Sequence, residues 1–326
     1  MKRVITMMAV CLCELVFSAC KGSPAEPKNE LGQDADSCAL VRPAFGGAAS
    51  AADRSLFAYE VNAPLNLQKT VQSTNNGIEV STISFSSPDG GLVTGLLFDP
   101  VARSSLRPGI VLMHGMPGTA GNVAGEALLL ASYGAVVIAI DAPFNRRSGS
   151  TVRFINDDRK EQIQLIKDLQ RAVDVLRDRP NVDDDRIAYV GFSYGGAMGV
   201  LFVSIERRLK AAALVVADGG LVSHFTGPED ATAMATLSCA TRVNWFRQMV
   251  PIEPIRFIAS ASPTPLLLQS GKLDALVSIA DAETLQAAAP EPKTIRWYQA
   301  GHGLDLQAAY DRHDWLHDQI GLDPRQ

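Results

Sequence analysis

The segment around Ser193 constrains the fold of this chain more than any other. Residues 191–195 read Gly-Phe-Ser-Tyr-Gly, with an apolar, strand-like run before them and a run of small residues typical of a helix after them. A Gly-x-Ser-x-Gly motif between a strand and a helix places the serine on a sharp, exposed turn. Glycine is needed there because the turn is strained and because strand and helix approach too closely for side chains. The motif therefore predicts that Ser193 is a nucleophile.

Three further segments supply the groups that a nucleophilic serine needs. Residues 107–118 are a short apolar run that ends in a His-Gly-x-x-Gly loop. Residues 265–274 run through an apolar strand to Asp274, and residues 294–303 lead to His302 between two glycines. Each segment ends just past the carboxyl end of a predicted strand, where open α/β sheets form their sites. Because a serine hydroxyl is a poor nucleophile at neutral pH, we expect His302 to act as its base and Asp274 to orient that base.

These linked motifs resemble those of the α/β-hydrolases, in particular the dienelactone hydrolases and acetyl xylan esterases. The run Gly-Phe-Ser-Tyr-Gly-Gly at 191–196 is also similar to that of prolyl-oligopeptidase-type catalytic domains. The resemblance covers residues 78–322 and implies a serine hydrolase with a catalytic triad of Ser193, Asp274 and His302. It implies no cofactor and no metal. The motifs are specific for the fold and only weakly specific for the substrate, because one fold hosts many chemistries.

The backbone N–H groups of Met116 and Tyr194 form the predicted oxyanion hole. Two such groups must point at the negative charge that develops on the substrate's carbonyl oxygen. Tyr194 directly follows the nucleophile, and Met116 follows the His-Gly pair of the upstream loop. Pro117 is excluded because proline has no N–H.

Asp218 is the alternative acid, because some α/β-hydrolases place their acid after the strand that precedes residues 265–274. Asp274 is favoured because Gly271 and the apolar residues after Asp274 fit the family's Gly-x-x-Asp pattern better. Among the other histidines, we expect His114 to brace the oxyanion loop, and His224 falls in an insertion.

The remaining pattern predicts one α/β-hydrolase domain over residues 77–326. Residues 78–99 alternate and break at Pro-Asp-Gly-Gly, which predicts a β-hairpin. Strand-like and helix-like runs then alternate, including a long amphipathic helix over 157–179. Such alternation is typical of a mostly parallel sheet covered by helices on both faces. The pattern lapses over residues 219–262, where we expect a small lid-like insertion after the sixth predicted strand.

The first 19 residues have the features of an export signal. Two basic residues precede an apolar run, and small residues precede Cys20. This start resembles a bacterial lipoprotein signal, in which Cys20 would carry the lipid; an ordinary secretory signal is the alternative. We therefore expect an exported protein of the bacterial cell envelope, either lipid-anchored to the outer membrane or periplasmic. Residues 20–76 would form a linker and an N-terminal extension.

The whole sequence favours a carboxylesterase that cleaves small or medium acyl esters through an acyl-enzyme intermediate. The net charge is −5 without a basic block, so we expect a small-molecule ester and no nucleic acid as partner. Membrane contact would come through the lipid on Cys20. One alternative is a prolyl-oligopeptidase-like peptidase, although residues 1–76 are too few for the gating domain of such enzymes. The other is a non-catalytic envelope binding or scaffold protein, although every triad residue and elbow glycine is present.

Cys38 and Cys239 are predicted to form a disulfide bond. Of the five cysteines, Cys11 and Cys13 fall in the signal and Cys20 at the lipidation position, so these two remain as a pair. The alternative is two separate small buried residues. Mass spectrometry of the mature protein under non-reducing conditions should find the two peptides linked, whereas two free thiols would contradict the prediction.

Overall fold

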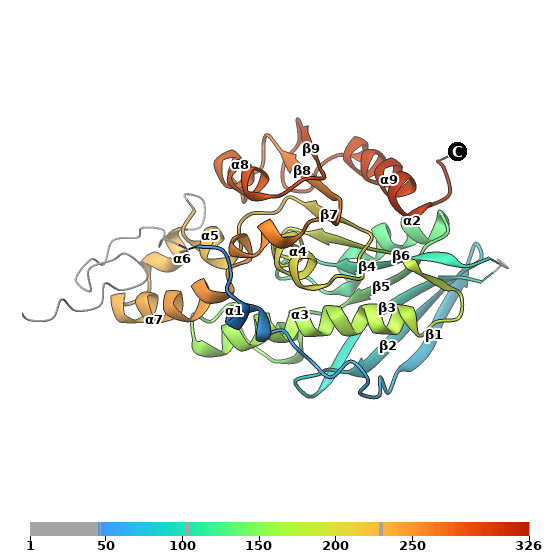
Figure 1. Ribbon diagram of the computed structural model, residues 1–326, viewed down its shortest axis with the longest axis horizontal. Coiled ribbons are helices and arrows are strands. Elements are labelled where there is room, and N and C mark those ends of the chain that lie inside the picture. The colour runs from blue at the N-terminus through green and yellow to red at the C-terminus, as the bar shows by residue number, and fades with distance from the viewer. Residues whose placement is uncertain (1–44, 46, 102–104, 228–230, 326) are drawn as a thin grey trace, which may run out of the picture.

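A twisted β-sheet forms the centre of the computed structural model (Figure 1). The structure describes residues 45, 47–101, 105–227 and 231–325, so the predicted signal, Cys20 and Cys38 lie outside the described residues. Within these ranges nine strands form one sheet in the order β1-β2-β3-β5-β4-β6-β7-β8-β9. The strands are β1 Gln68–Asn75, β2 Ile78–Ser86, β3 Leu92–Pro100, β4 Arg107–Met113, β5 Val136–Ile140, β6 Val182–Phe192, β7 Ala211–Val215, β8 Leu266–Gly271 and β9 Lys293–Tyr298.

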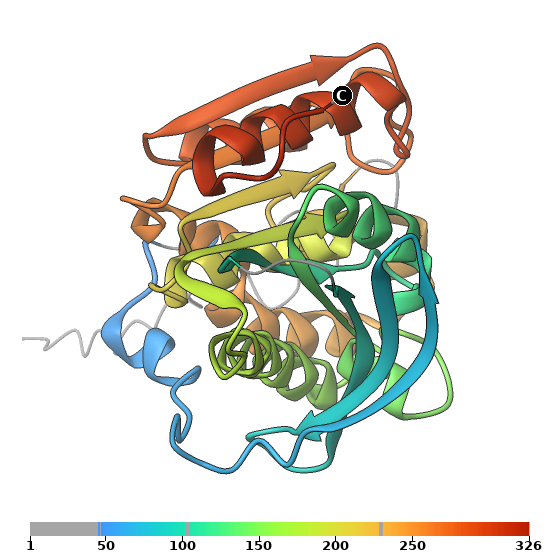
Figure 2. The same ribbon diagram turned by 90° about the vertical axis from the view of Figure 1, so that its right-hand side faces the viewer.

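The sheet has an antiparallel end and a parallel end. The pairs β1–β2, β2–β3 and β3–β5 are antiparallel, and every pair from β5–β4 to β8–β9 is parallel. Figure 2 shows the blue and cyan antiparallel strands at one end and the red β9 with its helix at the other. Every residue of β4, β5, β7 and β8 is buried, which explains why β5 and β7 are continuous apolar runs and why β4 and β8 are mainly apolar rather than alternating.

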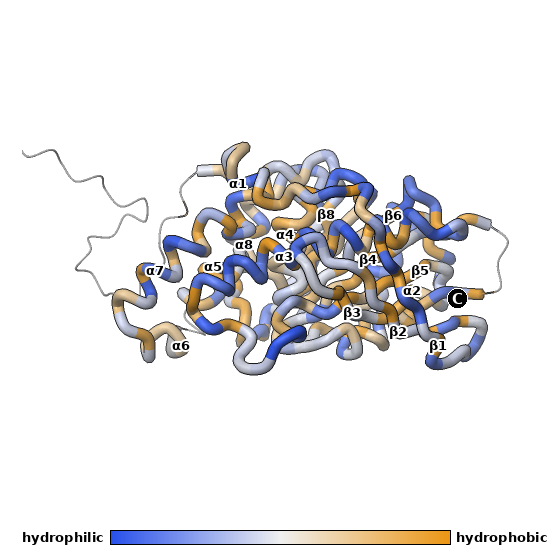
Figure 3. Tube along the Cα trace, turned by 90° about the horizontal axis from the view of Figure 1, so that it is seen from below, coloured by the Kyte–Doolittle hydropathy of each residue, from blue (hydrophilic) through white to orange (hydrophobic). Residues whose placement is uncertain are grey.

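Helices cover both faces of the sheet. They are α1 Ala51–Ser55, α2 Ala124–Ser132, α3 Asn156–Arg177, α4 Tyr194–Ile205, α5 Leu221–Phe225, α6 Ala231–Ala235, α7 Cys239–Met249, α8 Ile279–Ala288 and α9 Leu306–Ile320. One apolar core lies between the sheet and α3, α4 and α7, and a second lies between the sheet and α2 and α9. Figure 3 shows the corresponding apolar, orange segments in the middle strands. The two faces of the sheet thus pack into two separate apolar cores.

This architecture confirms the predicted α/β-hydrolase fold. The predicted hairpin is β2–β3, and the long helix expected over 157–179 is α3. The insertion at 219–262 lies between β7 and β8 and contains α5, α6 and α7. The sequence pattern does not predict strand β1, whose residues 68–75 fall in the expected N-terminal extension. Its residues are almost all exposed, so they carry no alternation of apolar and polar side chains.

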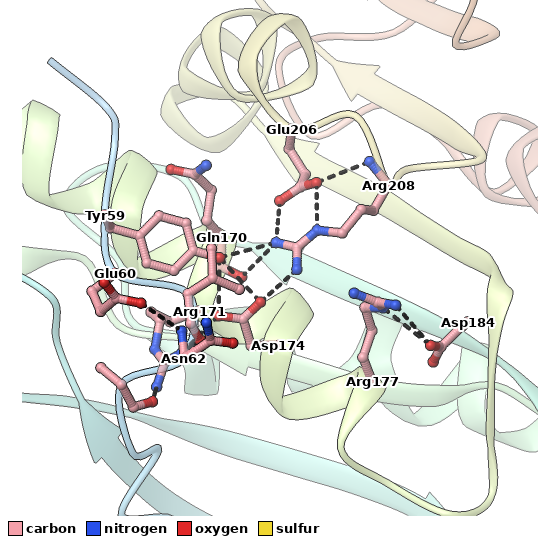
Figure 4. Close-up of polar contacts among 12 residues, drawn as sticks. Tyr59, Glu60, Asn62, Gln170, Arg171, Asp174, Arg177, Asp184, Glu206 and Arg208 are labelled. Carbon is pink, nitrogen blue, oxygen red and sulfur yellow. Dashed lines mark hydrogen bonds and ion pairs between the residues drawn. The ribbon is translucent and has the colours of Figure 1, made fainter. Parts of the chain in front are cut away.

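The segment that precedes β1 is held against α3 by a network of charged groups (Figure 4). The Arg171 guanidinium donates hydrogen bonds to two backbone carbonyl oxygens of this segment at 3.0 and 2.7 Å. It also pairs with Asp174 at 2.8 Å. Asp174 accepts further hydrogen bonds from the Tyr59 hydroxyl at 2.9 Å and from Arg208 at 2.6 Å. One carboxylate thus joins two arginines and the N-terminal segment.

We expect Asp174→Ala to destabilise the fold strongly. The side chains of Asp174 and Arg171 are 10% and 2% exposed, and removing one partner of a buried ion pair costs about 3–5 kcal/mol. Asp184→Ala is the matched control, because its pair with Arg177 is exposed and worth about 0–1 kcal/mol. Urea unfolding curves measure both free energies of unfolding, and equal losses would contradict the assignment.

Candidate active site

Ser193 occupies a strained turn between β6 and α4. Its backbone has φ +52° and ψ −116°, a conformation that residues with side chains rarely adopt. The Ser193 N–H donates to the carbonyl oxygen of Val215 at 2.8 Å, and the Ser193 carbonyl accepts from the N–H of Ala197 at 2.8 Å. The turn is therefore held by β7 on one side and by α4 on the other, as in a nucleophile elbow.

The elbow glycines are required by close backbone contacts. A Cβ atom at Gly191 would collide with the carbonyl oxygen of Gly195. A Cβ atom at Gly195 would lie 2.5 Å from the carbonyl oxygen of Met113, at the end of β4. Both separations are shorter than any side chain allows, so the motif read from the sequence has a direct steric cause.

The predicted oxyanion loop lies against the nucleophile. A Cβ atom at Gly115 would lie 3.2 Å from the Cβ atom of Ser193, so only glycine lets the loop come this close without displacement. Met116 and Tyr194 line the same cavity as Ser193. Tyr194 is the first residue of α4, a position whose N–H has no partner within the helix. The structure thus brings the predicted oxyanion residues to Ser193.

His114 braces the oxyanion loop, as the sequence predicts. Its Nδ1 atom lies 2.7 Å from the carbonyl oxygen of Gly115, and its Nε2 atom accepts a hydrogen bond from the N–H of Ala142 at 3.2 Å. Burial lowers the pKa of the His114 imidazole, although the contact with Gly115 opposes that shift. A neutral ring that donates from Nδ1 and accepts at Nε2 satisfies both contacts.

Asp274 and His302 form a hydrogen-bonded pair. Nδ1 of His302 donates to Asp274 Oδ2 at 2.9 Å, and the N–H groups of Leu276 and Val277 donate to Asp274 Oδ1 at 2.9 and 3.0 Å. Burial works against ionisation of Asp274, but these hydrogen bonds outweigh it and lower the pKa of the carboxyl group. Asp274 can therefore fix the orientation of His302 and stabilise its protonated form.

Gly271 lets the loops that carry this pair meet. A Cβ atom at Gly271 would lie 2.5 Å from the carbonyl oxygen of Ala300 and 2.8 Å from that of Gly301. The N–H of Leu273 also donates to the carbonyl oxygen of Ala300 at 3.0 Å. The Gly-x-x-Asp and Gly-His motifs are thus joined directly, through Leu273, one residue before Asp274, and Ala300, two residues before His302.

A cavity of about 60 Å³ lies beside Ser193. Its apolar walls come from the oxyanion loop, α4, the end of β7, α5 and the loop after Asp274, as Met116, Ala197, Val216, Leu221, Leu276 and Val277. Because Leu276 and Val277 also hold Asp274, the cavity lies next to the Asp274–His302 pair. No direct hydrogen bond joins Ser193 to His302, both of which the structure describes, and such contacts often tighten only when substrate binds.

Asp218, the alternative acid, has a different partner. Its Oδ2 atom lies 2.9 Å from Nδ1 of His224, so Asp218 pairs with His224 rather than with His302. Both residues line the cavity beside Ser193. The sequence pattern locates His224 in the insertion and indicates no role for it. The signal that could have found it is its position six residues after an aspartate at the carboxyl end of a strand.

Glu253 is buried next to this second pair. Its carboxylate accepts hydrogen bonds from the N–H groups of Val222 and Ser223 at 3.1 and 2.8 Å, at the start of α5. Burial raises the pKa of Glu253 to about 8, with a further rise from the nearby charge of Asp218, although the backbone hydrogen bonds oppose the shift. Glu253 thus fixes the short helix that carries His224.

The large apolar residues of the insertion pack into the core. Met234, Trp245, Phe246 and Met249 are fully or almost fully buried, and none of them lines the cavity beside Ser193. Trp245 donates from its indole nitrogen to Asp158 on α3 at 2.9 Å. These residues therefore hold the insertion on the sheet.

Several predictions concern residues that the structure does not describe. Cys239 is disulfide-bonded, but its predicted partner Cys38 lies outside the described residues, so the pairing stays a prediction. The lipidation of Cys20 stays one for the same reason. Within the described part of the chain, no helix is long and apolar enough to span a membrane, and no cluster of three or more His, Cys, Asp or Glu residues could hold a metal ion.

Fold and site together define an α/β-hydrolase with a serine at its nucleophile elbow. Residues 56–227 match the model of the acetyl xylan esterase family, AXE1. Because this match spans more than half of the sequence, the chain belongs to that family.

Curated relatives match parts of the chain. The YfhR protein of Escherichia coli K12 is 31% identical over 161 residues, which cover 47% of this chain and 49% of YfhR. YuxL of Bacillus subtilis strain 168, described as an uncharacterized peptidase, is 28% identical over 239 residues, which cover 68% of this chain and 35% of YuxL. The chain thus spans about half the length of the curated relatives that it matches first.

Solved structures share the fold. The acetyl xylan esterase from Paenibacillus sp. R4 superposes with a TM-score of 0.66 at 18% identity, over 82% of this chain and 92% of that enzyme. Acetyl xylan esterase 1 from Thermoanaerobacterium sp. JW/SL YS485 has the same TM-score and coverage at 13% identity. At these identities the likeness shows the fold alone.

Glu253 should make the stability of the protein depend on pH. The group titrates near its ordinary pKa of 4.5 in the unfolded chain and at about 8 in the folded one. Between these values the folded state holds the extra proton, so this stabilisation is present in full below about 4.5 and is lost as pH rises through about 8.

The Glu253→Gln variant removes this titration. Its free energy of unfolding, measured in urea at several pH values from 5 to 9, should fall less with rising pH than that of the wild type. Glu283→Gln, an exposed change on α8, is the control and should follow the wild type. Parallel curves for Glu253→Gln and the wild type would contradict the raised pKa.

Proposed function

We propose that this chain is an exported serine esterase that hydrolyses esters of small acyl groups. The observation that carries the proposal is a small cavity lined by the strained Ser193 and the oxyanion residues Met116 and Tyr194. Its wall also includes Leu276 and Val277, whose N–H groups hold Asp274 of the Asp274–His302 pair. Membership of the acetyl xylan esterase family supports the esterase class.

The proposed reaction follows from the positions of these groups. Nε2 of His302 takes the proton of the Ser193 hydroxyl while the serine oxygen attacks the ester carbonyl. The N–H groups of Met116 and Tyr194 stabilise the negative charge on the carbonyl oxygen. His302 then gives its proton to the departing alcohol, which leaves an acyl group on Ser193.

In the second half of the reaction, water hydrolyses the acyl-enzyme. His302 removes a proton from a water molecule, which attacks the acyl-enzyme and forms a second tetrahedral intermediate. The bond to the Ser193 oxygen breaks, His302 returns the proton to that oxygen, and the carboxylic acid is released. Asp274 remains ionised throughout and stabilises the imidazolium of His302.

The size of the cavity supports a small acyl group. One water molecule needs about 10–15 Å³ of such space, so a cavity of about 60 Å³ has room for a group of a few heavy atoms. Helix α5 and the loop after Asp274 form part of its wall. Acetyl and propionyl esters fit this space best.

Export and lipid anchoring are part of the proposal and are supported by the sequence before residue 21 alone. The mass spectrometry that tests the Cys38–Cys239 disulfide also reads the mature N-terminus. A lipid mass on Cys20 is expected, and an unmodified N-terminus near this position would favour the ordinary secretory signal.

A serine peptidase is the second candidate function. The likeness to YuxL, which is described as a peptidase, favours it, and the same triad can attack an amide. Peptide p-nitroanilides with proline before the scissile bond distinguish the two functions. Turnover of these amides at a rate comparable to that of acetyl esters would establish the peptidase.

The esterase proposal is tested with p-nitrophenyl esters from acetyl to decanoyl. We expect the acetyl ester to be preferred over the decanoyl ester by at least about tenfold, because of the cavity's volume. Ser193→Ala should lower kcat/KM by at least about 1,000-fold and abolish labelling by a fluorophosphonate probe. Ser132→Ala, an exposed serine on α2, is the control and should behave like the wild type.

Folded wild-type protein that neither hydrolyses these esters nor reacts with the probe would contradict the esterase. It would favour the non-catalytic binding or scaffold protein. Equal activity of the wild type and Ser193→Ala would show that the hydrolysis does not use this serine.

A further inference from the structure

We propose that Val216 sets the size of the acyl group that this site accepts. Its side chain lies in the wall of the cavity beside Ser193, and a strained backbone fixes it there. The inference rests on the esterase function proposed above and names the residue that limits the substrate of that reaction. It concerns the acyl half of the ester and not the alcohol half.

Val216 has a backbone conformation that suits its side chain poorly. Its φ is +46°, a region in which a branched Cβ atom is crowded by the backbone. Among the residues that the structure describes, no other β-branched residue has a φ in this region. Strain of this kind persists only where the surroundings hold the residue in place, and it is found mainly at functional sites.

Three neighbouring elements hold the backbone at Val216. Its N–H donates to the carbonyl oxygen of Gln269 on β8 at 2.8 Å. The carbonyl oxygen of the preceding residue, Val215, accepts a hydrogen bond from the N–H of Ser193 at 2.8 Å. Helix α4 lies so close that a Cβ atom at Gly196 would be 2.8 Å from the same oxygen of Val215. The position of Val216 is therefore tied to that of the nucleophile.

The positive φ decides which way the Val216 side chain points. Along β7, Leu214 belongs to the core with α3, α4 and α7, and Val215 belongs to the core with α2 and α9. A regular strand would direct Val216 to the side of Leu214, because successive side chains alternate. Val216 instead packs in the core of Val215, and Ala217 returns to the other core. In this orientation the Val216 side chain also lines the cavity beside Ser193.

Val216 belongs to the buried part of the cavity wall. Val216, Leu221 and Ala197 are 3%, 4% and 6% exposed, whereas Leu276 in the same wall is 48% exposed. A group that enters from solvent therefore reaches Leu276 before it reaches the buried residues. In a cavity of about 60 Å³, which holds a few heavy atoms, the two methyl groups of Val216 take up space that a longer group needs.

The position of the triad assigns this cavity to the acyl half of the ester. Ser193 and the oxyanion residues Met116 and Tyr194 line the cavity. His302, which the structure also describes, does not line it. Since His302 gives its proton to the departing alcohol, the alcohol leaves on the side of that imidazole. The group that remains on Ser193 is the one that the cavity receives.

The Val216→Ala variant tests the inference with two series of esters. p-Nitrophenyl esters from acetyl to hexanoyl vary the acyl half, and alkyl acetates from methyl to butyl, followed in a pH-stat, vary the alcohol half. One methylene group in an apolar pocket changes kcat/KM by about 10- to 200-fold. We expect the butanoyl-to-acetyl ratio of kcat/KM to rise by at least about tenfold over the wild type. The ratios among the alkyl acetates should stay unchanged.

The Val216→Ile variant should act in the opposite direction. Its additional methylene group narrows the cavity, so the propanoyl-to-acetyl ratio of kcat/KM should fall by about tenfold. Opposite changes in the two variants identify size as the cause, because a loss of stability alone would not produce them. If Val216→Ala does not fold, Val216→Ile decides, since an unchanged ratio in that variant overturns the inference equally.

Val137→Ala is the matched control. Val137 lies on β5, is fully buried in the same core as Val216 and does not line the cavity. The change removes the same two methyl groups, so it should lower the free energy of unfolding in urea. It should nevertheless keep the wild-type preference among the acyl esters and the reaction with the fluorophosphonate probe.

Three results would overturn the inference. The first is a Val216→Ala that reacts with the probe and has the acyl preference of the wild type. The second is a change confined to the alkyl acetates, which would assign the cavity to the alcohol half. The third is an equal change in Val137→Ala, which would make the effect a general loosening of the core. Failure of the esterase proposal is seen separately, as equal hydrolysis of all esters by the wild type and Ser193→Ala.

Discussion

The close approach of β6 and α4 at Ser193 is the constraint on which the rest of the site depends. The two elements meet so tightly that glycine is required at 191 and 195, and the serine between them is forced to positive φ. This strain is maintained because β7 and α4 hydrogen-bond the Ser193 backbone from both sides. As a result, the Ser193 hydroxyl lies at the end of β6, next to the first N–H groups of α4. The loop after β4 approaches this point with Gly115, and the loops after β7 and β8 line the cavity beside it. The loop after β9 joins the loop after β8 through the His302–Asp274 hydrogen bond.

The parallel half of the sheet explains why two Asp–His pairs lie so near one serine. In a parallel sheet the carboxyl ends of neighbouring strands share one edge, so the loops after β7 and β8 open on the same side as the elbow. Asp218 follows β7 and takes a histidine from α5, whereas Asp274 follows β8 and takes one from the loop after β9. In the proposed function Asp274–His302 moves protons, whereas Asp218–His224 is part of the wall of the cavity beside Ser193. Among the described residues of the insertion, Gly220 and α5 line the cavity, whereas the buried aromatic residues of α7 pack the insertion on the sheet.

Much of the fold could be predicted because its signals are local. Alternating strand and helix patterns predicted the parallel sheet, and the Pro-Asp-Gly-Gly break predicted the β2–β3 hairpin. Strand β1 could not be predicted, because an exposed edge strand has no apolar face and obtains its order from pairing with β2. The segment before β1 is held by Arg171 and Asp174 of α3, which lie more than 100 residues later in the sequence. No local sequence pattern predicts such contacts. In the site, local motifs predict the elbow, the oxyanion loop and the Asp274–His302 pair. The glycines of these motifs are needed where two backbone segments approach closely.

The sequence by itself determined the chemistry that this chain can support: a serine on an elbow, and loops that end in the histidine and aspartate it needs. Those features follow from residue types at fixed spacing, because glycine, proline and strand ends act over a few residues. The tertiary structure decided which acid meets which histidine, how large the cavity beside Ser193 is, and that His224 belongs to its wall. These depend on distances between segments far apart in the chain, and only the packing of the sheet and its insertion sets such distances.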